Sequence, residues 1–419
     1  IMEEQRQEQQ LYDNLVPSSL VPKRKVERDD VGVLKREIKT VVPMEGSTNY
    51  GESHTQKASF RWNFKACELL RDAKLRGKIK ITGGTKATID GNMKALFSQV
   101  QLQKTNGPVI EQIERANRYI MSNELAVMNQ TNCDLNWADW SDSYYKADSA
   151  TAGASGNSNK RHITATAQDF EIYIADLLNF PRKNHCWFSF AQDGLDLVLS
   201  FDKNKNILTY NDSASVIVIT DLYLDIPVYF MNEAYYAEVE KQPIIQNFSG
   251  VRLFSVKCDQ NENHISIPVG VNNLIGVKIL FRDSSEENGT VATTPASSQK
   301  RYLTKSVNPA ITSFQMRLGD LQFPDRPILS SYQLHDYLKE FHLIHHDSDV
   351  GNLINVWNYN DPSTSTQATL DTTDMLYLGF NLSKNCLNTG LPAKDTNLEI
   401  DISCTQTSNL IADVFCLYS

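Results

Sequence analysis

A group of histidines near residue 340 offers the sharpest candidate for chemistry in this sequence. His335, His342 and His346 fall on one side of a helix if a helix extends that far, and His345 and Asp347 lie beside them. A pair at i, i+4 such as His342 and His346 can hold zinc. No His-Glu-x-x-His motif and no further His or Cys ligand pair accompanies them. We therefore interpret the histidines as the polar flank of a helix at an interface.

A second candidate is a cluster of aromatic and acidic side chains. Aromatic faces beside carboxylates are common in sugar-binding sites. Trp and Tyr are also favoured where protein subunits meet. We favour packing or a subunit interface for this cluster and keep glycan binding as the alternative. The cluster consists of Trp137, Asp139, Trp140, Asp142, Tyr144 and Tyr145.

The remaining motifs predict no chemistry. Gly83-Gly84-Thr85-Lys86 follows a predicted strand but lacks the P-loop spacing, so it indicates a tight turn. Lys23-Arg24-Lys25 could touch anionic lipid or nucleic acid, yet nearby acidic residues largely cancel its charge. No Gly-x-Ser-x-Gly elbow is present. We assign no catalytic, cofactor-binding or metal-binding residue, and we expect neither enzymatic activity nor a cofactor.

Length and composition indicate a folded chain of two domains. The 419 residues exceed one ordinary β-sandwich, and 41% hydrophobic residues are enough for large cores. The net charge of −9 argues against a protein whose body wraps nucleic acid by neutralising its phosphates, and it leaves open a local basic tail. The seven scattered cysteines form no Cys-x-x-Cys pair, so we expect buried, reduced thiols. We expect no signal peptide and no transmembrane helix.

Two kinds of segment are expected in the chain. Residues 1–45 are rich in charge and contain two Leu-Val-Pro repeats, so we predict an extended N-terminal arm. From about residue 58 onward, apolar residues alternate with polar ones, which is typical of strands with one buried face. The alternating sets are Phe60, Trp62 and Phe64; Leu75, Ile79 and Ile81; Leu195, Leu197, Leu199 and Phe201; Val277, Ile279 and Phe281; Phe314, Met316 and Leu318; and Leu398, Ile400, Ile402 and Cys404.

Helical spacing interrupts this pattern once in each half. Pro108 begins a predicted helix to Leu125. Ser330 or Ser331 could cap a second helix, with Leu334, Leu338 and Phe341 on one stripe. The order of strands, one helix and more strands thus occurs twice, which indicates an internal duplication. Long exposed loops are predicted at 148–160, 284–300 and 360–373.

The order of these segments resembles the double jelly-roll major capsid proteins of tailless double-stranded DNA viruses, especially polinton-like viruses and virophages. Together the matching segments span most of residues 55–419, and their order and spacing carry the resemblance. The segments are Leu96–Tyr119 with Asn106-Gly107-Pro108; Phe170–Phe201 with Phe180-Pro181 and Gly194-Leu195-Asp196-Leu197; Ile219–Tyr229; and Phe314–Ile328 with Phe323-Pro324-Asp325-Arg326-Pro327.

The resemblance implies an all-β fold of two eight-stranded antiparallel jelly rolls in tandem, each with a short helix inserted. The expected domains are an arm at 1–45, a first jelly roll at 46–240 and a second at 241–419. The resemblance also implies a homotrimer that forms a pseudo-hexagonal capsomer of an icosahedral virion, assembled in the host cytoplasm or nucleus. The implied partners are neighbouring capsomers, penton and minor capsid proteins, and inner-membrane lipid through the arm. The alternatives are a carbohydrate- or receptor-binding jelly roll and, less favoured, a metal-dependent enzyme of the cupin kind.

Overall fold

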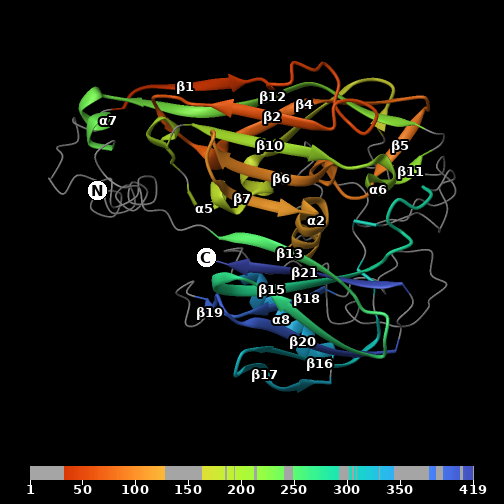
Figure 1. The fold of residues 1–419 in the computed structure, drawn as a ribbon. Helices are drawn as coiled ribbons and strands as arrows, with labels where there is room; N and C mark the ends of the chain where they lie inside the picture. Colours follow the sequence, from red (N-terminus) through yellow and green to blue (C-terminus); the bar gives the residue numbers. More distant parts are fainter. Residues whose placement is uncertain are drawn as a thin grey trace, which may run out of the picture.

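The computed structural model describes strands for most of the chain. The described residues are 33–127, 163–184, 186–192, 194–211, 215–239, 249–291, 302–303, 306–307, 309–329, 331–343, 377–383, 390–405 and 409–418. Strands dominate the described residues, and most of them lie in two pairs of sheets stacked along the molecule (Figure 1).

The first half of the chain forms a sandwich of two antiparallel sheets. One sheet has the order β1-β12-β4-β9 and the other β2-β10-β6-β7. The strands are β1 (Val33–Val41), β2 (Lys57–Trp62), β4 (Lys74–Thr82), β6 (Phe97–Lys104), β7 (Val109–Glu114), β9 (Gln168–Tyr173), β10 (Leu195–Phe201) and β12 (Val216–Met231). A two-residue strand, β3 (Cys67–Glu68), adds to β12, and β5 (Lys86–Ile89), β8 (Ile163–Thr164) and β11 (Leu208–Asn211) form a small separate sheet.

The second half repeats this arrangement. Its sheets have the orders β13-β21-β15-β18 and β14-β20-β16-β17. The strands are β13 (Gly250–Lys257), β14 (Glu262–Pro268), β15 (Val271–Asp283), β16 (Ile311–Leu318), β17 (Leu321–Ile328), β18 (Tyr377–Asn381), β20 (Asn397–Cys404) and β21 (Leu410–Tyr418), with the short β19 (Leu391–Ala393) beside β15.

The two halves have one topology. If the eight long strands of each half are counted in chain order, one sheet is 1-8-3-6 and the other is 2-7-4-5 in both. This is the eight-stranded antiparallel jelly roll, and its occurrence twice confirms the predicted fold class and the predicted internal duplication. The strand alternation is confirmed too, because Phe60, Leu197, Ile279, Met316 and Ile400 are all fully buried.

Helices are few and short. The two longest are α2 (Ala116–Val127) and α8 (Ser331–Leu343), and each lies between the fifth and sixth long strands of its jelly roll. The others are η2 (Leu70–Asp72), η3 (Met93–Leu96), α4 (Ile174–Leu177), α5 (Asn179–Lys183), η5 (Ser189–Gln192), α6 (Asn204–Ile207) and α7 (Glu233–Val239). The helix predicted from Ser331 is confirmed, and its stripe of Leu334, Leu338 and Phe341 is buried.

The helix predicted from Pro108 to Leu125 was wrong in its first half. Residues Val109–Glu114 form strand β7, and the helix begins only at Ala116. Asn106 at φ 57° and Gly107 turn the chain back from β6, so β7 pairs with β6 as a hairpin. Val109, Ile110 and Ile113 are β-branched, and this type of side chain favours strands over helices.

The predicted arm at 1–45 also needs a correction. Val33–Val41 is strand β1, which pairs with β12 along most of its length and forms the first strand of the first jelly roll. Lys35 to Lys39 makes the segment look polar in sequence, because this strand lies at the edge of its sheet and keeps exposed residues on both faces. Residues 1–32 lie outside the described part of the chain.

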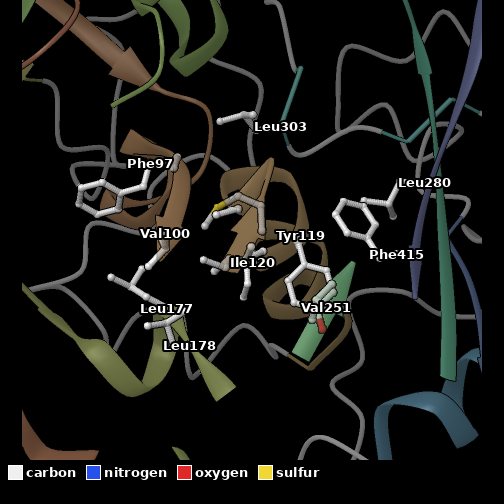
Figure 2. Packing of buried hydrophobic residues seen from close by; sticks show 14 of the residues in the cluster. Phe97, Val100, Tyr119, Ile120, Leu177, Leu178, Val251, Leu280, Leu303 and Phe415 are labelled. Carbon is white, nitrogen blue, oxygen red and sulfur yellow. The ribbon is translucent and has the colours of Figure 1, made fainter. Parts of the chain in front are cut away.

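The jelly rolls are stacked so that an edge of the first meets the second. Strand β7 of the first jelly roll lies beside β13 of the second, and α2 points into the space between them (Figure 1). One hydrophobic cluster runs through both sandwiches, and Tyr119 and Ile120 of α2 lie in it together with Val251, Leu280 and Phe415 of the second jelly roll (Figure 2).

Candidate assembly surfaces

The surface that joins the two jelly rolls carries several buried charged side chains. Along β15, Val277, Ile279 and Phe281 face the interior of the second sandwich. The alternate residues Lys278 and Arg282 face the first jelly roll and are nevertheless buried. Helix α2 covers this outer face, which in an isolated sandwich would be in water.

Five charged side chains form what we term the inter-roll network: Arg115, Arg118, Arg282, Glu287 and Asp413. Asp413 Oδ2 accepts a hydrogen bond from Arg282 Nε at 2.9 Å and lies 3.5 Å from Arg118 Nε. Glu287 pairs with Arg282 at 2.9 Å and with Arg115 at 3.1 Å. Since Arg115 and Arg118 belong to the first jelly roll and the other three to the second, the network spans the junction.

The network is anchored by further contacts on both sides. Arg115 donates to Tyr302 Oη at 2.8 Å, and Arg118 donates to the backbone carbonyls of Tyr302 and Phe281. Arg118 and Asp413 are almost completely buried, so their charges are shielded from water. Removing one partner of a buried, hydrogen-bonded pair leaves the other charge uncompensated and typically costs about 3–5 kcal/mol.

A buried lysine adds a second link across the same junction. Lys278 Nζ donates to Asn123 Oδ1 of α2 at 2.7 Å and lies over the ring of Tyr119 at 5.9 Å. Burial of the ammonium lowers the pKa of Lys278 well below its usual value. Tyr119 in turn contacts Phe415, with ring centroids 5.1 Å apart (Figure 2). Together with the network, these contacts fasten the two jelly rolls into one block.

Strand β1, in contrast to the buried junction, carries apolar side chains that are exposed. Leu34 and Ile38 on β1 and Val42 directly after it are 72%, 63% and 67% exposed; we term these three residues the apolar stripe. β1 is an edge strand of its sheet. Exposed edges with apolar side chains are templates for association with another chain.

A second exposed apolar site lies at the far end of the molecule. Leu321 at the start of β17 is 44% exposed, and Leu329 directly after β17 is 73% exposed. β17 is the edge strand of the last sheet, and its Pro324 and Pro327 are tolerated there because an edge strand need not use every backbone N–H. Figure 1 shows β1 and β17 on opposite outer sides of the stacked jelly rolls. The two apolar sites therefore lie on strands at opposite ends of the stacked jelly rolls.

Two buried glutamates hold local structure in the first jelly roll. Glu68 accepts hydrogen bonds from Trp62 Nε1 at 3.0 Å and from Ser189 Oγ, and burial raises its pKa to about 8. Glu111 accepts from the backbone N–H groups of Asn179 and Phe180 at 3.0 and 2.7 Å, and burial raises its pKa to about 7. Both are satisfied by donors that fix chain segments, and this suits a structural role.

The described cysteines are buried free thiols, as expected from their spacing. They are Cys67, Cys186, Cys258, Cys404 and Cys416. Burial raises the pKa of Cys258 to about 11 and that of Cys416 to about 12, so these thiols are poor nucleophiles at neutral pH. Cys133 and Cys386 lie outside the described residues.

Most of the motifs considered for chemistry lie where the structure gives no side-chain description. His335 and His342 fall on α8, but their side chains, like His346 and the whole Trp137–Tyr145 cluster, are outside the described residues. Lys23-Arg24-Lys25 and the loops at 148–160 and 360–373 lie outside them too. Within the described ranges, no group of three or more His, Cys, Asp or Glu side chains could hold a metal ion. Gly83 at φ 88° lies in the turn between β4 and β5, as predicted.

The inter-roll network was missed by sequence reasoning, although a signal for it exists. Lys278 and Arg282 interrupt the apolar residues of Val271–Asp283, and Asp413 interrupts those of Leu410–Tyr418. A charged residue inside an otherwise apolar strand predicts a buried polar contact on the face of the sheet that points away from the interior of the sandwich. The sequence does not identify its partners, since Arg118 and Asp413 are far apart along the chain.

None of the described helices is long and apolar enough to cross a membrane. No protein-family model matches the chain, and no curated protein matches it by sequence. Solved structures do match it over almost its full length. The Faustovirus major capsid protein aligns with a TM-score of 0.57 at 9% identity, covering 95% of this chain and 92% of that one.

Two further structures give the same result. A chain of the Sputnik virophage aligns with a TM-score of 0.58 at 11% identity, covering 95% of this chain and 88% of that chain. The mavirus major capsid protein aligns with a TM-score of 0.50 at 11% identity, covering 96% and 91%. At such low identity the likeness concerns the fold. The chain therefore has the double jelly-roll fold of the major capsid proteins of virophages and large DNA viruses.

Proposed function

We propose that this chain is a major capsid protein that forms homotrimeric, pseudo-hexagonal capsomers of an icosahedral virion. The observation that carries the proposal is the match of both jelly rolls, in order and over almost the whole chain, to the Faustovirus and mavirus major capsid proteins. A lectin or an enzyme needs one binding site on one sandwich, whereas a pseudo-hexagonal block of three chains needs two sandwiches of similar shape in each chain.

The inter-roll network supports this proposal. Buried ion pairs are poor sources of net stability, but they fix how two bodies are oriented. Arg118, Arg282 and Asp413 thereby hold one angle between the jelly rolls. A lattice of identical blocks requires such a fixed shape.

The exposed apolar residues support self-association. Full burial of a Leu or Ile side chain typically contributes about 1.5–3 kcal/mol. Leu34, Ile38 and Leu329 make no such contribution in the isolated chain. Obligate interfaces cover apolar surface of this kind.

The finer parts of the proposal concern partners and place. We propose that the first jelly roll extends through β12 and the second from β13 onward, and that the capsomer contacts neighbouring capsomers, penton and minor capsid proteins. The N-terminal arm, now limited to residues before β1, is proposed to contact neighbours or inner-membrane lipid. The protein is then a component of the virion capsid, assembled in the host cytoplasm or nucleus, and has a structural rather than an enzymatic role.

Light scattering on a size-exclusion column tests the proposal. A trimer of about 142 kDa, three times the chain mass of 47.4 kDa, is the expected result. A monomer that stays monomeric at high concentration would contradict it. Glycan binding by such a monomer would then favour the lectin alternative.

A further inference from the structure

The second jelly roll contains a hydroxyl–carboxylate–guanidinium triad on three adjacent strands. Ser255 Oγ on β13 donates to Asp413 Oδ1 on β21 at 2.6 Å. Arg282 Nε on β15 donates to the other oxygen, Asp413 Oδ2, at 2.9 Å. Arg282 also reaches a second carboxylate, Glu287, at 2.9 Å. Asp413 and Arg282 of this triad are buried, with Arg118 of α2 against Asp413, whereas Ser255 is exposed.

The first jelly roll contains the same triad on its own corresponding strands. Thr40 Oγ1 on β1 donates to Asp225 Oδ1 on β12 at 2.6 Å. Arg76 on β4 donates through NH1 to Asp225 Oδ2 at 3.0 Å. Arg76 likewise reaches a second carboxylate, Glu171, at 2.9 Å.

The two triads occupy equivalent positions in the strand registers. Asp413 is paired with Ser255 on one side and Leu280 on the other, and Arg282 stands two residues after Leu280. In the first jelly roll, Asp225 is paired with Thr40 on one side and Lys74 on the other, and Arg76 stands two residues after Lys74. The first, eighth and third strands carry the triad in both. The two outer faces can therefore be compared residue by residue.

The comparison shows that one face is covered and the other is open. Asp413 is completely buried, and Arg118 of the first jelly roll approaches it. Asp225, the equivalent of Asp413, is buried too, but the side chain of Arg76 is 37% exposed whereas that of its equivalent Arg282 is 4% exposed. Ile38, two residues before Thr40, is 63% exposed, whereas its equivalent Leu253, two residues before Ser255, is only partly exposed.

We propose that the open face around Thr40, Asp225 and Arg76, together with the apolar stripe of β1, binds the second jelly roll of another copy of this chain. Within one chain, the first jelly roll covers the equivalent face of the second through the β7 edge and α2. Between chains, the β17 edge of one copy takes the equivalent place on the next copy. This inference rests on the proposed capsid function and identifies the two surfaces that would meet.

The far end of the second jelly roll has the side chains for this contact. Leu329 follows β17 as Arg115 follows β7, and Arg115 makes the contact within the chain. Leu329 is 73% exposed and is complementary in character to the apolar stripe. The exposed carboxylates of Asp320, just before β17, and Asp325, within β17, suit a face that carries Lys74 and Lys78.

A contact between two different surfaces of one chain is heterologous, so it forms a closed ring or an open filament. Here the contact between chains repeats the contact within each chain. Jelly rolls of alternating kind would then follow one another around a ring at nearly equal angles. Three chains supply six jelly rolls, which gives the pseudo-hexagonal outline.

Two single substitutions at exposed positions test the two surfaces separately. Ile38→Asp damages the open face, and Leu329→Asp damages the end of the second jelly roll. Neither residue is buried, so both variants are expected to fold with the circular dichroism of the natural chain. Ser266→Asp on β14, an exposed strand position away from both surfaces, is the matched control.

Each variant alone is expected to shift the protein from trimer to monomer in light scattering, while Ser266→Asp stays trimeric. Mixing the two monomers gives the decisive result. The Ile38→Asp chain retains an intact Leu329 end, and the Leu329→Asp chain retains an intact open face. The intact Leu329 end of one chain can bind the intact open face of the other, so the mixture should give a dimer that does not close into a ring.

The outcomes separate this inference from the proposed function. If the natural chain and both variants are all trimeric, the assigned surfaces are wrong, but the proposed capsid function is not contradicted. Monomeric variants that do not dimerise on mixing would overturn the heterologous pairing. A natural chain that is monomeric would contradict the capsid proposal itself.

Discussion

Substitution of Asp413 by Asn tests whether the inter-roll network fixes the two jelly rolls. The change keeps the shape of the side chain but removes the charge that faces Arg282 at 2.9 Å and Arg118 at 3.5 Å. Arg282 then keeps Glu287, which it shares with Arg115, while Arg118 loses the carboxylate that it faces in the network. The destabilisation expected for breaking a buried pair is about 3–5 kcal/mol.

The assay is thermal unfolding followed by circular dichroism and by calorimetry. For a unit the size of one jelly roll, about 2–4 °C is lost per kcal/mol, so Asp413→Asn should unfold roughly 6–20 °C earlier than the natural chain. Ser255→Ala removes only the hydroxyl that donates to Asp413 at 2.6 Å and should cost about 1 kcal/mol. This milder variant keeps the test informative if Asp413→Asn does not fold.

The matched control is Asp259→Asn, which breaks the exposed pair between Asp259 and Lys257. Exposed ion pairs contribute little, so its unfolding midpoint should equal that of the natural chain. An Asp413→Asn variant that unfolds together with this control would refute the reasoning. The buried carboxylate would then not be what holds the junction.

Three further predictions follow from buried groups. Glu68→Gln should flatten the pH dependence of stability. Because burial raises the pKa of Glu68 to about 8, the folded chain keeps this proton to a higher pH than the unfolded chain does, so the stability of the natural chain falls as pH rises from about 4.5 to 8. Denaturant melts across this pH range measure the effect. Burial lowers the pKa of Lys278, so the folded chain loses this proton at a lower pH than the unfolded chain does, and the natural chain should gain stability as pH rises toward 10.5. Lys278→Met should remove this gain, which a comparison of denaturant melts at pH 7 and pH 9 measures. In a Cys133→Ser, Cys386→Ser variant, the five buried thiols should react with a maleimide only after unfolding, and rapid labelling of the folded chain would show that burial does not protect them.

Much of the fold was predictable because the jelly-roll sandwich imposes a simple pattern on its strands. A sheet with one buried face places alternate residues in the core, so Leu195, Leu197 and Leu199 indicated β10 without any long-range information. The stripe of Leu334, Leu338 and Phe341 indicated α8 in the same way. The repeated order of strands and helix then suggested the duplication, which the sheet topology confirms.

Errors arose where two patterns fit the same residues. Val109, Ile113 and Ala116 suit a helical stripe, but Val109 and Ile113 also suit a strand, and the turn at Asn106 and Gly107 decides for the strand. β1 lies within the segment that was predicted as an arm, and that prediction rested on the charged residues and the two Leu-Val-Pro repeats that precede the strand. At the edge of a sheet, charged side chains remain in water on both faces.

The contacts between jelly rolls could not be predicted, because their partners are distant in sequence. Thr40, Asp225 and Arg76 come from three separate strands, and no local motif links them. Only the strand registers reveal that Ser255, Asp413 and Arg282 repeat them. A charged residue in an apolar strand predicts that a partner exists but does not identify it.

Electron microscopy of the purified assembly tests the central claim most directly. The account predicts a ring of six similar lobes with threefold symmetry, in which the β17 end of one chain lies on the β1 face of the next. A twofold dimer in which β1 faces β1, or a chain that forms no closed assembly, would contradict it.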